Sequence, residues 1–321
     1  MDGVLPEQGE IVIKKRLLYF CSYVPVKHLE SMGFEMVAPG DETEDERERR
    51  EYEPSRAICG YMQAFGRMRF EVFDGVILAH CCSSTERLYD YLRYRFPSLF
   101  IHILELPGQM NKDGEERLMG EYASLFSALQ KHFGYGRPAP FVPAEKAFSV
   151  NDEGILLLGG GVHPGWYAML RSIFYPFSLK IDDCLSSLRG DGLLHGKGRN
   201  VCCPHMLEYP SWLEQQLEKG EGEIRAVIGI YSPKCDYALF SIPLLMDICR
   251  RRGRPFLAIE EAFTPLLGEQ NRIRLEAFRE SLQEERVCAD GQGEREEREE
   301  RKGWGEEPFS ASIPLGGRGG G

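Results

Sequence analysis

Short apolar runs alternate with amphipathic stretches in the first half of the chain. Apolar runs bounded by turn residues predict strands at residues 16–20, 34–38, 75–80 and 99–104. Leu88 and Leu92 have helical spacing, and helices are predicted at residues 25–32, 84–95 and 115–133. Strand and helix therefore follow one another in βα units.

The second half repeats this rhythm. Strands are predicted at residues 154–158, 179–181, 226–231 and 255–259, and helices at 165–174, 236–252 and 271–286. Alternating βα units imply parallel sheets with helices on both faces, the α/β class. The irregular, proline-containing stretch 135–153 is interpreted as the crossing between two domains. The predicted division is an N-terminal extension 1–15, α/β domains 16–140 and 141–286, and a disordered charged, Gly-rich tail 287–321.

Composition narrows the class of protein. A chain of 321 residues suggests two domains, at roughly 150 residues each. No apolar run approaches the ~20 residues that span a bilayer, and residues 1–15 lack a signal-peptide pattern. A cytoplasmic protein without a membrane partner is expected. The net charge of −11 argues against nucleic acid as a partner.

Ten cysteines without a signal peptide argue against a disulfide framework, because the cytosol keeps thiols reduced. Cys249 and Cys288 are interpreted as small buried hydrophobic residues. Three others, Cys59, Cys82 and Cys235, each lie at a predicted turn; Cys82 and Cys235 follow strands. Ligands bind at the carboxyl ends of strands in open α/β sheets, and helix N-termini favour the thiolate that binds metal. Three converging thiolates could hold an iron–sulfur cluster and leave one iron open for substrate.

Other motifs give weaker signals. The glycine-rich run 159–165 lacks the features of a P-loop and is best explained as a tight strand-to-helix turn. Histidines 80, 102, 163 and 205 lie near strand ends without zinc-site spacing, and most are expected to be satisfied by local hydrogen bonds. A turn is also favoured over a metal site for residues 202–205, and a solvated face is favoured for the acidic patch 41–48.

Several segments together resemble the 2-hydroxyacyl-CoA dehydratase family, which includes benzoyl-CoA reductase subunits and double-cubane cluster proteins. Residues 74–90 are similar to the family's stretch D-G-V-V-x-P-H-T-C-D-S-x-R-R-L-Y-D, and residues 270–278 to its Q-x-R-T-R-x-E-A-F. Further similar segments, in the same order as in the family, are residues 19–25, 101–107, 182–184 and 234–245. The resemblance extends from about residue 16 to 284.

The resemblance implies two Rossmann-like (flavodoxin-like) domains with a cluster site between them. It assigns Cys59, Cys82 and Cys235 as ligands of a [4Fe-4S] cluster, with Cys81 as an alternative to Cys82. The implied enzyme is a lyase of anaerobic metabolism, which removes water from an (R)-2-hydroxyacyl-CoA through a ketyl radical. The implied partners are a related second subunit or a second copy, and an ATP-dependent iron–sulfur activator, since this chain has no P-loop. Two alternatives stay open: an ATP-dependent reductase or electron-transfer protein with an [8Fe-9S] double-cubane cluster, and a non-catalytic partner subunit.

Overall fold

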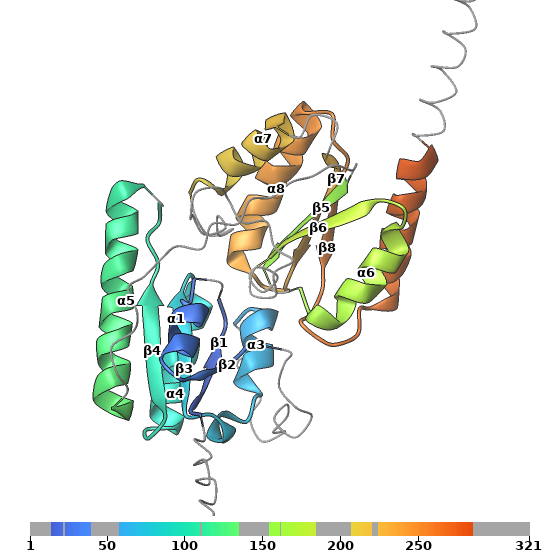
Figure 1. Ribbon diagram of the computed structural model, residues 1–321. Coiled ribbons are helices and arrows are strands. Elements are labelled where there is room, and N and C mark those ends of the chain that lie inside the picture. The colour runs from blue at the N-terminus through green and yellow to red at the C-terminus, as the bar shows by residue number, and fades with distance from the viewer. Residues whose placement is uncertain are drawn as a thin grey trace, which may run out of the picture. The chain divides into compact units, whose positions relative to one another are not determined.

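Two four-stranded sheets, with all strands parallel, form the framework of the computed structural model (Figure 1). The structure describes residues 14–21, 23–39, 58–109, 111–134, 154–160, 162–183, 207–219 and 224–284. The chain divides into two compact units, Met1–Ile273 and Arg274–Gly321, and both sheets lie in the first. The predicted crossing at 135–153 and the predicted tail lie outside the described residues, so the division into domains stays a prediction.

The first sheet has the strand order β2-β1-β3-β4. Its strands are β1 (Arg16–Tyr19), β2 (Glu35–Val37), β3 (Gly75–His80) and β4 (Phe100–Glu105). Leu18 of β1 is aligned with Val37 on one side and with Val76 on the other. This is the flavodoxin-like order, in which the chain reverses its direction of growth between β1 and β3. The predicted α/β class is confirmed.

Helices cover both faces of this sheet. They are α1 (Val26–Ser31) and α5 (Lys112–Phe133) on one face, and α3 (Gly60–Gly66) and α4 (Ser83–Arg95) on the other. Successive strand residues point to opposite faces. Leu17 and Ile77 therefore pack in the core with α1 and α5, whereas Leu18 and Val76 pack in the core with α3 and α4. Burial of β1 and β3 on both faces explains why their sequences are continuously apolar.

Helix α5 begins and ends at recognisable signals. The side chain of Asn111 accepts a hydrogen bond from the Gly114 N–H at 2.9 Å, which caps the first turn. Gly134 ends the helix in the left-handed conformation, with φ of 74°. The Tyr122 hydroxyl donates to the Tyr23 carbonyl at 2.6 Å, and this bond connects the helix to the turn after β1. The helix starts three residues before the predicted position because its cap, Asn111, precedes the apolar pattern.

The second sheet has the order β6-β5-β7-β8, which is the order of the first sheet repeated. Its strands are β5 (Gly154–Gly160), β6 (Ser178–Asp183), β7 (Ile224–Tyr231) and β8 (Phe256–Glu260). Its helices are α6 (Tyr167–Phe174), α7 (Tyr209–Lys219) and α8 (Asp236–Arg251). Leu156 and Val227 pack with α7 and α8 in one core, which also contains Cys249, fully buried as predicted.

Two elements of this second part differ from the prediction. The helix predicted from Gly165 starts as a short 3-10 helix, Pro164–Trp166, because the His163 side chain accepts the Gly165 N–H at 3.0 Å. Helix α7 was not predicted, although Trp212, Leu213 and Leu217 give it a buried apolar face.

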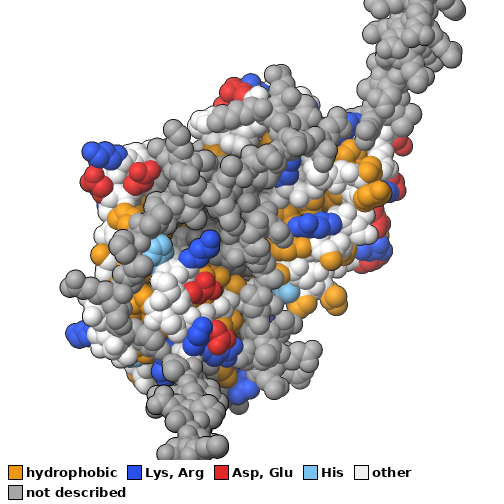
Figure 2. Space-filling view, in the orientation of Figure 1, with side chains coloured by type: hydrophobic (Ala, Val, Ile, Leu, Met, Phe, Trp, Pro, Cys, Tyr) orange, Lys and Arg blue, Asp and Glu red, His pale blue; other side chains and the backbone are white. Residues whose placement is uncertain are grey.

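The final helix begins at residue 269, two residues before the predicted start, and is described as far as residue 284. Across the described ranges, no helix has the length and apolar character needed to cross a membrane. On the face drawn in Figure 2, described Lys and Arg side chains are scattered, and several lie beside Asp or Glu. Arg251 of α8 and Arg252, which follows it, form ion pairs with Glu214 of α7. The acidic patch 41–48 lies outside the described residues.

Candidate functional site

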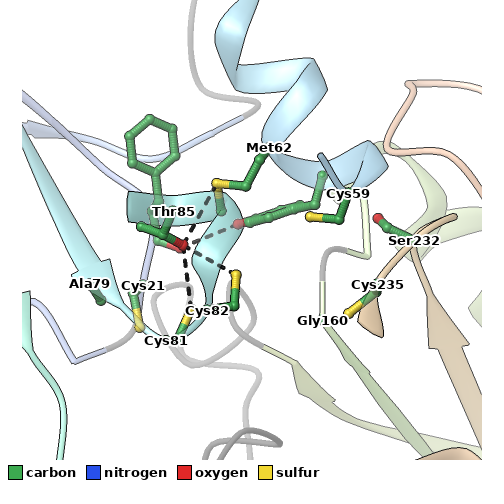
Figure 3. A pocket seen from close by; sticks show the side chains of 12 residues that line it. Cys21, Cys59, Met62, Ala79, Cys81, Cys82, Thr85, Gly160, Ser232 and Cys235 are labelled. Atoms are coloured by element: carbon green, nitrogen blue, oxygen red, sulfur yellow. Dashed lines mark hydrogen bonds between the residues drawn. The ribbon is translucent and has the colours of Figure 1, made fainter. Parts of the chain in front are cut away.

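The carboxyl ends of β1, β3, β5 and β7 line one cavity (Figure 3). In each sheet these are the two strands between which the strand order reverses, the usual place for a ligand in an open α/β sheet. The cavity has a volume of about 50 Å³, whereas a single water needs only ~10–15 Å³. Its lining residues are Phe20, Cys21, Cys59, Tyr61, Met62, Ala79, Cys81, Cys82, Thr85, Gly160, Ser232 and Cys235.

Cys82 is the N-cap residue of α4. Its backbone is extended, with φ of −163° and ψ of 166°, and its carbonyl accepts the Thr85 N–H at 3.1 Å. The side chain makes no capping hydrogen bond. Its sulfur lies 3.5 Å from the Thr85 hydroxyl oxygen, next to the N-terminal turn of α4. Cys82 is one of the residues that line the cavity.

Cys235 holds the same position in the second sheet, as the N-cap residue of α8. It closes the turn Ser232–Pro233–Lys234–Cys235, in which the Cys235 N–H donates to the Ser232 carbonyl at 3.2 Å. Lys234 has φ of 59°. Proline at the second position and a left-handed third residue are typical of a type II turn. The turn fixes the direction in which Cys235 enters the helix.

Cys59 is the N-cap residue of α3 and is 7% exposed. Its N–H donates to the Ser84 hydroxyl at 3.3 Å. The next N–H, that of Gly60, donates to the Pro233 carbonyl at 2.9 Å. A Cβ at Gly60 would lie 3.2 Å from Pro233 Cδ, so glycine allows this close approach. The bond joins the start of α3 to the turn that carries Cys235.

The structure thus brings the three predicted cysteines to one cavity, each at the first turn of a helix. Burial, together with the neighbouring Cys82 and Cys235 thiols, raises the pKa of the Cys59 thiol to about 11. Burial also raises the pKa of Cys235, and the Cys82 thiol adds to this. Burial outweighs the preference of helix N-termini for the thiolate. A bound metal would reverse this balance, because a coordinated thiol loses its proton.

Two further cysteines, Cys81 and Cys21, line the same cavity. The sulfur of Cys81, the predicted alternative to Cys82, lies 3.7 Å from the Thr85 hydroxyl oxygen, so one hydroxyl contacts both sulfurs of the doublet. Sequence reasoning did not propose Cys21 as a site residue. It follows β1 as Cys82 follows β3, and this shared position at a strand end was the available signal.

The donor set is chemically suited to an iron–sulfur cluster, because cysteine thiolates are the ligands that hold such clusters. In the described part of the chain, no group of three or more His, Cys, Asp or Glu side chains is arranged to bind one metal ion. In a cluster each thiolate binds a different iron, so the ligands need not converge on one point. The Ser232 hydroxyl is buried beside these thiols and has no hydrogen-bond partner among the described residues, which fits a cavity that holds a bound group.

The histidines near strand ends are outside this cavity lining. The Nδ1 atom of His80 lies 2.7 Å from the Glu105 carboxylate, and that of His163 accepts the Gly165 N–H. These two are satisfied locally, as predicted, but Nε2 of His102 is buried without a partner. Burial lowers the pKa of His102. His205, the cysteines at 202 and 203, and Cys184 lie outside the described residues.

The fold and the cavity define a doubly wound α/β protein with a thiol-lined site at the switch points of its sheets. A family model, 2-hydroxyglutaryl-CoA dehydratase D-component, matches residues 21–136. Within these residues, the match agrees with the resemblance to the 2-hydroxyacyl-CoA dehydratase family seen in the sequence. No curated protein matches the chain.

The matched segment covers only part of the site. It contains Cys21, Cys59, Cys81 and Cys82, all of which line the cavity. Cys235 and Ser232 lie beyond it, and they join the site through the fold of the second sheet.

Proposed function

We propose that this chain is the iron–sulfur subunit of a 2-hydroxyacyl-CoA dehydratase, a lyase that removes water from an (R)-2-hydroxyacyl-CoA. One observation carries the proposal: the N-cap cysteines of α3, α4 and α8 line a single cavity. The family match supports a subunit of this type. The proposal adds the cofactor, the chemistry and the partners.

Cys59, Cys82 and Cys235 would hold a [4Fe-4S] cluster. When bound, the cluster would supply one electron to the thioester carbonyl; the resulting ketyl radical would lose the 2-hydroxyl group as hydroxide and then the acidic C3 proton, and the electron would be given back as the enoyl-CoA forms. With only three cysteines as ligands, the cluster would also supply Lewis-acid chemistry toward a substrate oxygen.

The chain's own residues would favour such a group in two ways. The N-terminal ends of α3, α4 and α8 direct partial positive charge toward the N-cap cysteines, which stabilises negative charge near the first turn. The aromatic side chains of Phe20 and Tyr61 line the cavity, and Phe20 packs edge-on against Phe65 at 4.1 Å between ring centroids. This apolar wall limits the access of water.

The partners follow from the chemistry. Reduction of a thioester needs a strong one-electron donor, and we propose a separate ATP-hydrolysing iron–sulfur activator in this role. The D-component of the matching family is by its name one part of a larger enzyme. A related second subunit, or a second copy of this chain, would complete the assembly.

Anaerobic reconstitution with iron and sulfide tests the cofactor. We expect a brown protein with about four iron atoms per chain, the content of one [4Fe-4S] cluster. A colourless protein without iron would contradict the proposal and leave a non-catalytic partner subunit as the better interpretation.

Substrate turnover tests the reaction. The reconstituted chain, its second subunit, the activator, ATP and a reductant are incubated with (R)-2-hydroxyglutaryl-CoA, and the enoyl-CoA product is measured by chromatography. Product that depends on ATP supports the proposal. A chain that holds about eight irons per dimer in one cluster and dehydrates no 2-hydroxyacyl-CoA would instead be a double-cubane reductase.

A further inference from the structure

Ser232 is a buried hydroxyl at the wall of the cavity. The residue is 2% exposed, and its oxygen has no hydrogen-bond partner in the part of the chain that the structure describes. Buried hydroxyls are nearly always paired, so such an atom indicates a partner that the protein alone does not supply. Figure 3 shows its oxygen on the side of the cavity where Cys59 and Cys235 lie.

The backbone keeps the hydroxyl at this place. Ser232 is the first residue of the turn that ends at Cys235, and its carbonyl accepts the Cys235 N–H at 3.2 Å. The next residue, Pro233, accepts the Gly60 N–H at 2.9 Å. Ser232 therefore belongs to a short segment whose backbone is hydrogen-bonded to Cys235 and to Gly60 at the start of α3.

The opposite wall of the cavity shows what such a hydroxyl does when a sulfur is near. Thr85 is 1% exposed, and its oxygen lies 3.5 Å from the Cys82 sulfur and 3.7 Å from the Cys81 sulfur. It also donates to the Met62 sulfur at 3.9 Å. Thr85 is thus satisfied by sulfur atoms of the protein, whereas Ser232 faces the same space without one.

We propose that Ser232 is a positioning residue that donates an O–H hydrogen bond to a sulfur of the bound cluster, on its Cys59 and Cys235 side. The inference rests on the proposed function, because it requires a cluster in the cavity. The cluster sulfides and cysteine thiolates are hydrogen-bond acceptors, and a hydroxyl that lacks an acceptor complements them. A hydrogen bond to sulfur stabilises the reduced cluster, which carries one more negative charge, and so raises its reduction potential.

The test compares S232A with S31A after anaerobic reconstitution. Ser31 is an exposed serine of α1 whose hydroxyl already bonds the His28 carbonyl, so S31A is a matched loss of one hydroxyl away from the cavity. We expect S232A to keep its iron, to show a more negative reduction potential in spectroelectrochemistry, and to lose one exchangeable proton coupling in ENDOR spectra of the reduced cluster in H2O and D2O. S31A should match the wild type in all three.

The outcomes separate the inference from the proposed function. A loaded S232A with an unchanged potential and the same proton couplings overturns the role of Ser232 alone. A wild-type chain that takes up no iron overturns the proposed function and the inference with it. If S232A takes up no cluster, S232T, which keeps the hydroxyl, decides: recovery of loading and of the wild-type potential supports the inference, and equal loss overturns it.

Discussion

The two sheets have the same strand order but contribute differently to the cavity. In each, the third strand along the chain ends at a helix whose N-cap is a cysteine: Cys82 after β3 and Cys235 after β7. The first sheet adds three more thiols, those of Cys21, Cys59 and Cys81. The second adds a hydroxyl, Ser232, and the backbone of Gly160.

This difference separates two tasks that the repeated topology makes possible. Most of the thiols that line the cavity come from the first sheet, and the family match falls on it. The second sheet contributes one thiol, that of Cys235, and the Ser232 hydroxyl. A doubled fold can thus present two switch points to one bound group, with one half specialised for holding it and the other for adjusting its properties.

The largest expected effect is the loss of iron when Cys82 or Cys235, which hold equivalent positions in the two sheets, is replaced. If both are ligands, C82A and C235A should each lose most of the iron after reconstitution, because removal of one thiolate leaves an iron without its protein ligand. C81A should retain its iron. Iron and sulfide analysis with the absorbance near 400 nm gives the measurement.

C249A is the control, since Cys249 is buried in the core with α7 and α8 and is outside the cavity lining. It should load like the wild type. Iron loss in C81A together with retention in C82A would show that Cys81 is the ligand and that the two sheets use different positions.

The second prediction compares the cores of the two sheets. Leu92 of α4, in a core of the first sheet, is 0% exposed, and Ile248 of α8, in a core of the second sheet, is 2% exposed. L92A and I248A should each lower the free energy of unfolding by about 2–5 kcal/mol, through lost burial and the cavity left behind. Urea unfolding followed by circular dichroism gives the values.

The shape of the transition sharpens this comparison. Both sheets lie in one compact unit, and Phe263, which follows β8, packs against Tyr61 of α3 at 5.0 Å between ring centroids. We therefore expect one cooperative transition that both variants shift. Two separate transitions, each moved by only one variant, would support the division into domains predicted from the sequence.

The sequence allowed the elements to be predicted better than the site. Strand β3 was predicted with its observed bounds because an apolar run between Asp74 and a cysteine doublet is buried on both faces. Helix α7 was missed although its apolar spacing was visible. Cap residues such as Asn111 lie outside the apolar pattern, so the start of α5 was predicted too late.

The site depends on contacts that a linear pattern does not contain. Cys59, Cys82 and Cys235 were singled out by their position at predicted turns and assigned as ligands only through the resemblance, since their spacing defines no metal motif. Cys21 was missed although it follows β1 as Cys82 follows β3, because only the cavity shows that these two strand ends meet. Whether Ser232 has a partner depends on atoms from segments far apart in the chain, so no local signal could show it.

A third prediction tests whether the amino-terminal edge of the first sheet affects stability without affecting the cavity. Asp74 accepts hydrogen bonds from Lys15 Nζ at 2.9 Å and from the Arg16 N–H at 2.8 Å. Burial alone would raise the pKa of Asp74, but these bonds and the two nearby positive charges outweigh it and hold the pKa below its usual value. The carboxyl therefore contributes stability above its unfolded pKa of about 4, and this contribution is lost as the pH falls through the folded pKa.

D74N should lower the free energy of unfolding by about 1 kcal/mol or less at pH 7, because the site is partly exposed to solvent. The difference from the wild type should shrink as the pH falls below about 4, and cluster loading should not change. Denaturation at several pH values checks this. A difference that stayed constant with pH would show that the charge of Asp74 is not its cause.

The smallest expected effect on stability comes from a substitution at Lys234. The chain takes different routes from β3 to the N-cap cysteine of α4 and from β7 to that of α8. Cys82 follows β3 after one intervening residue, whereas Cys235 requires a turn with φ of 59° at Lys234. A residue with a Cβ in the left-handed conformation costs about 1–2 kcal/mol. Glycine removes this cost, but its larger conformational freedom in the unfolded chain offsets part of the gain in stability. K234G should therefore raise the free energy of unfolding by about 0.5 kcal/mol, measured by thermal unfolding.

The K234G variant should load cluster like the wild type, because glycine favours the same turn and leaves Cys235 in place. Unchanged stability combined with lost iron would mean that the Lys234 side chain itself supports the cluster, and that the turn of the second sheet contributes more than geometry.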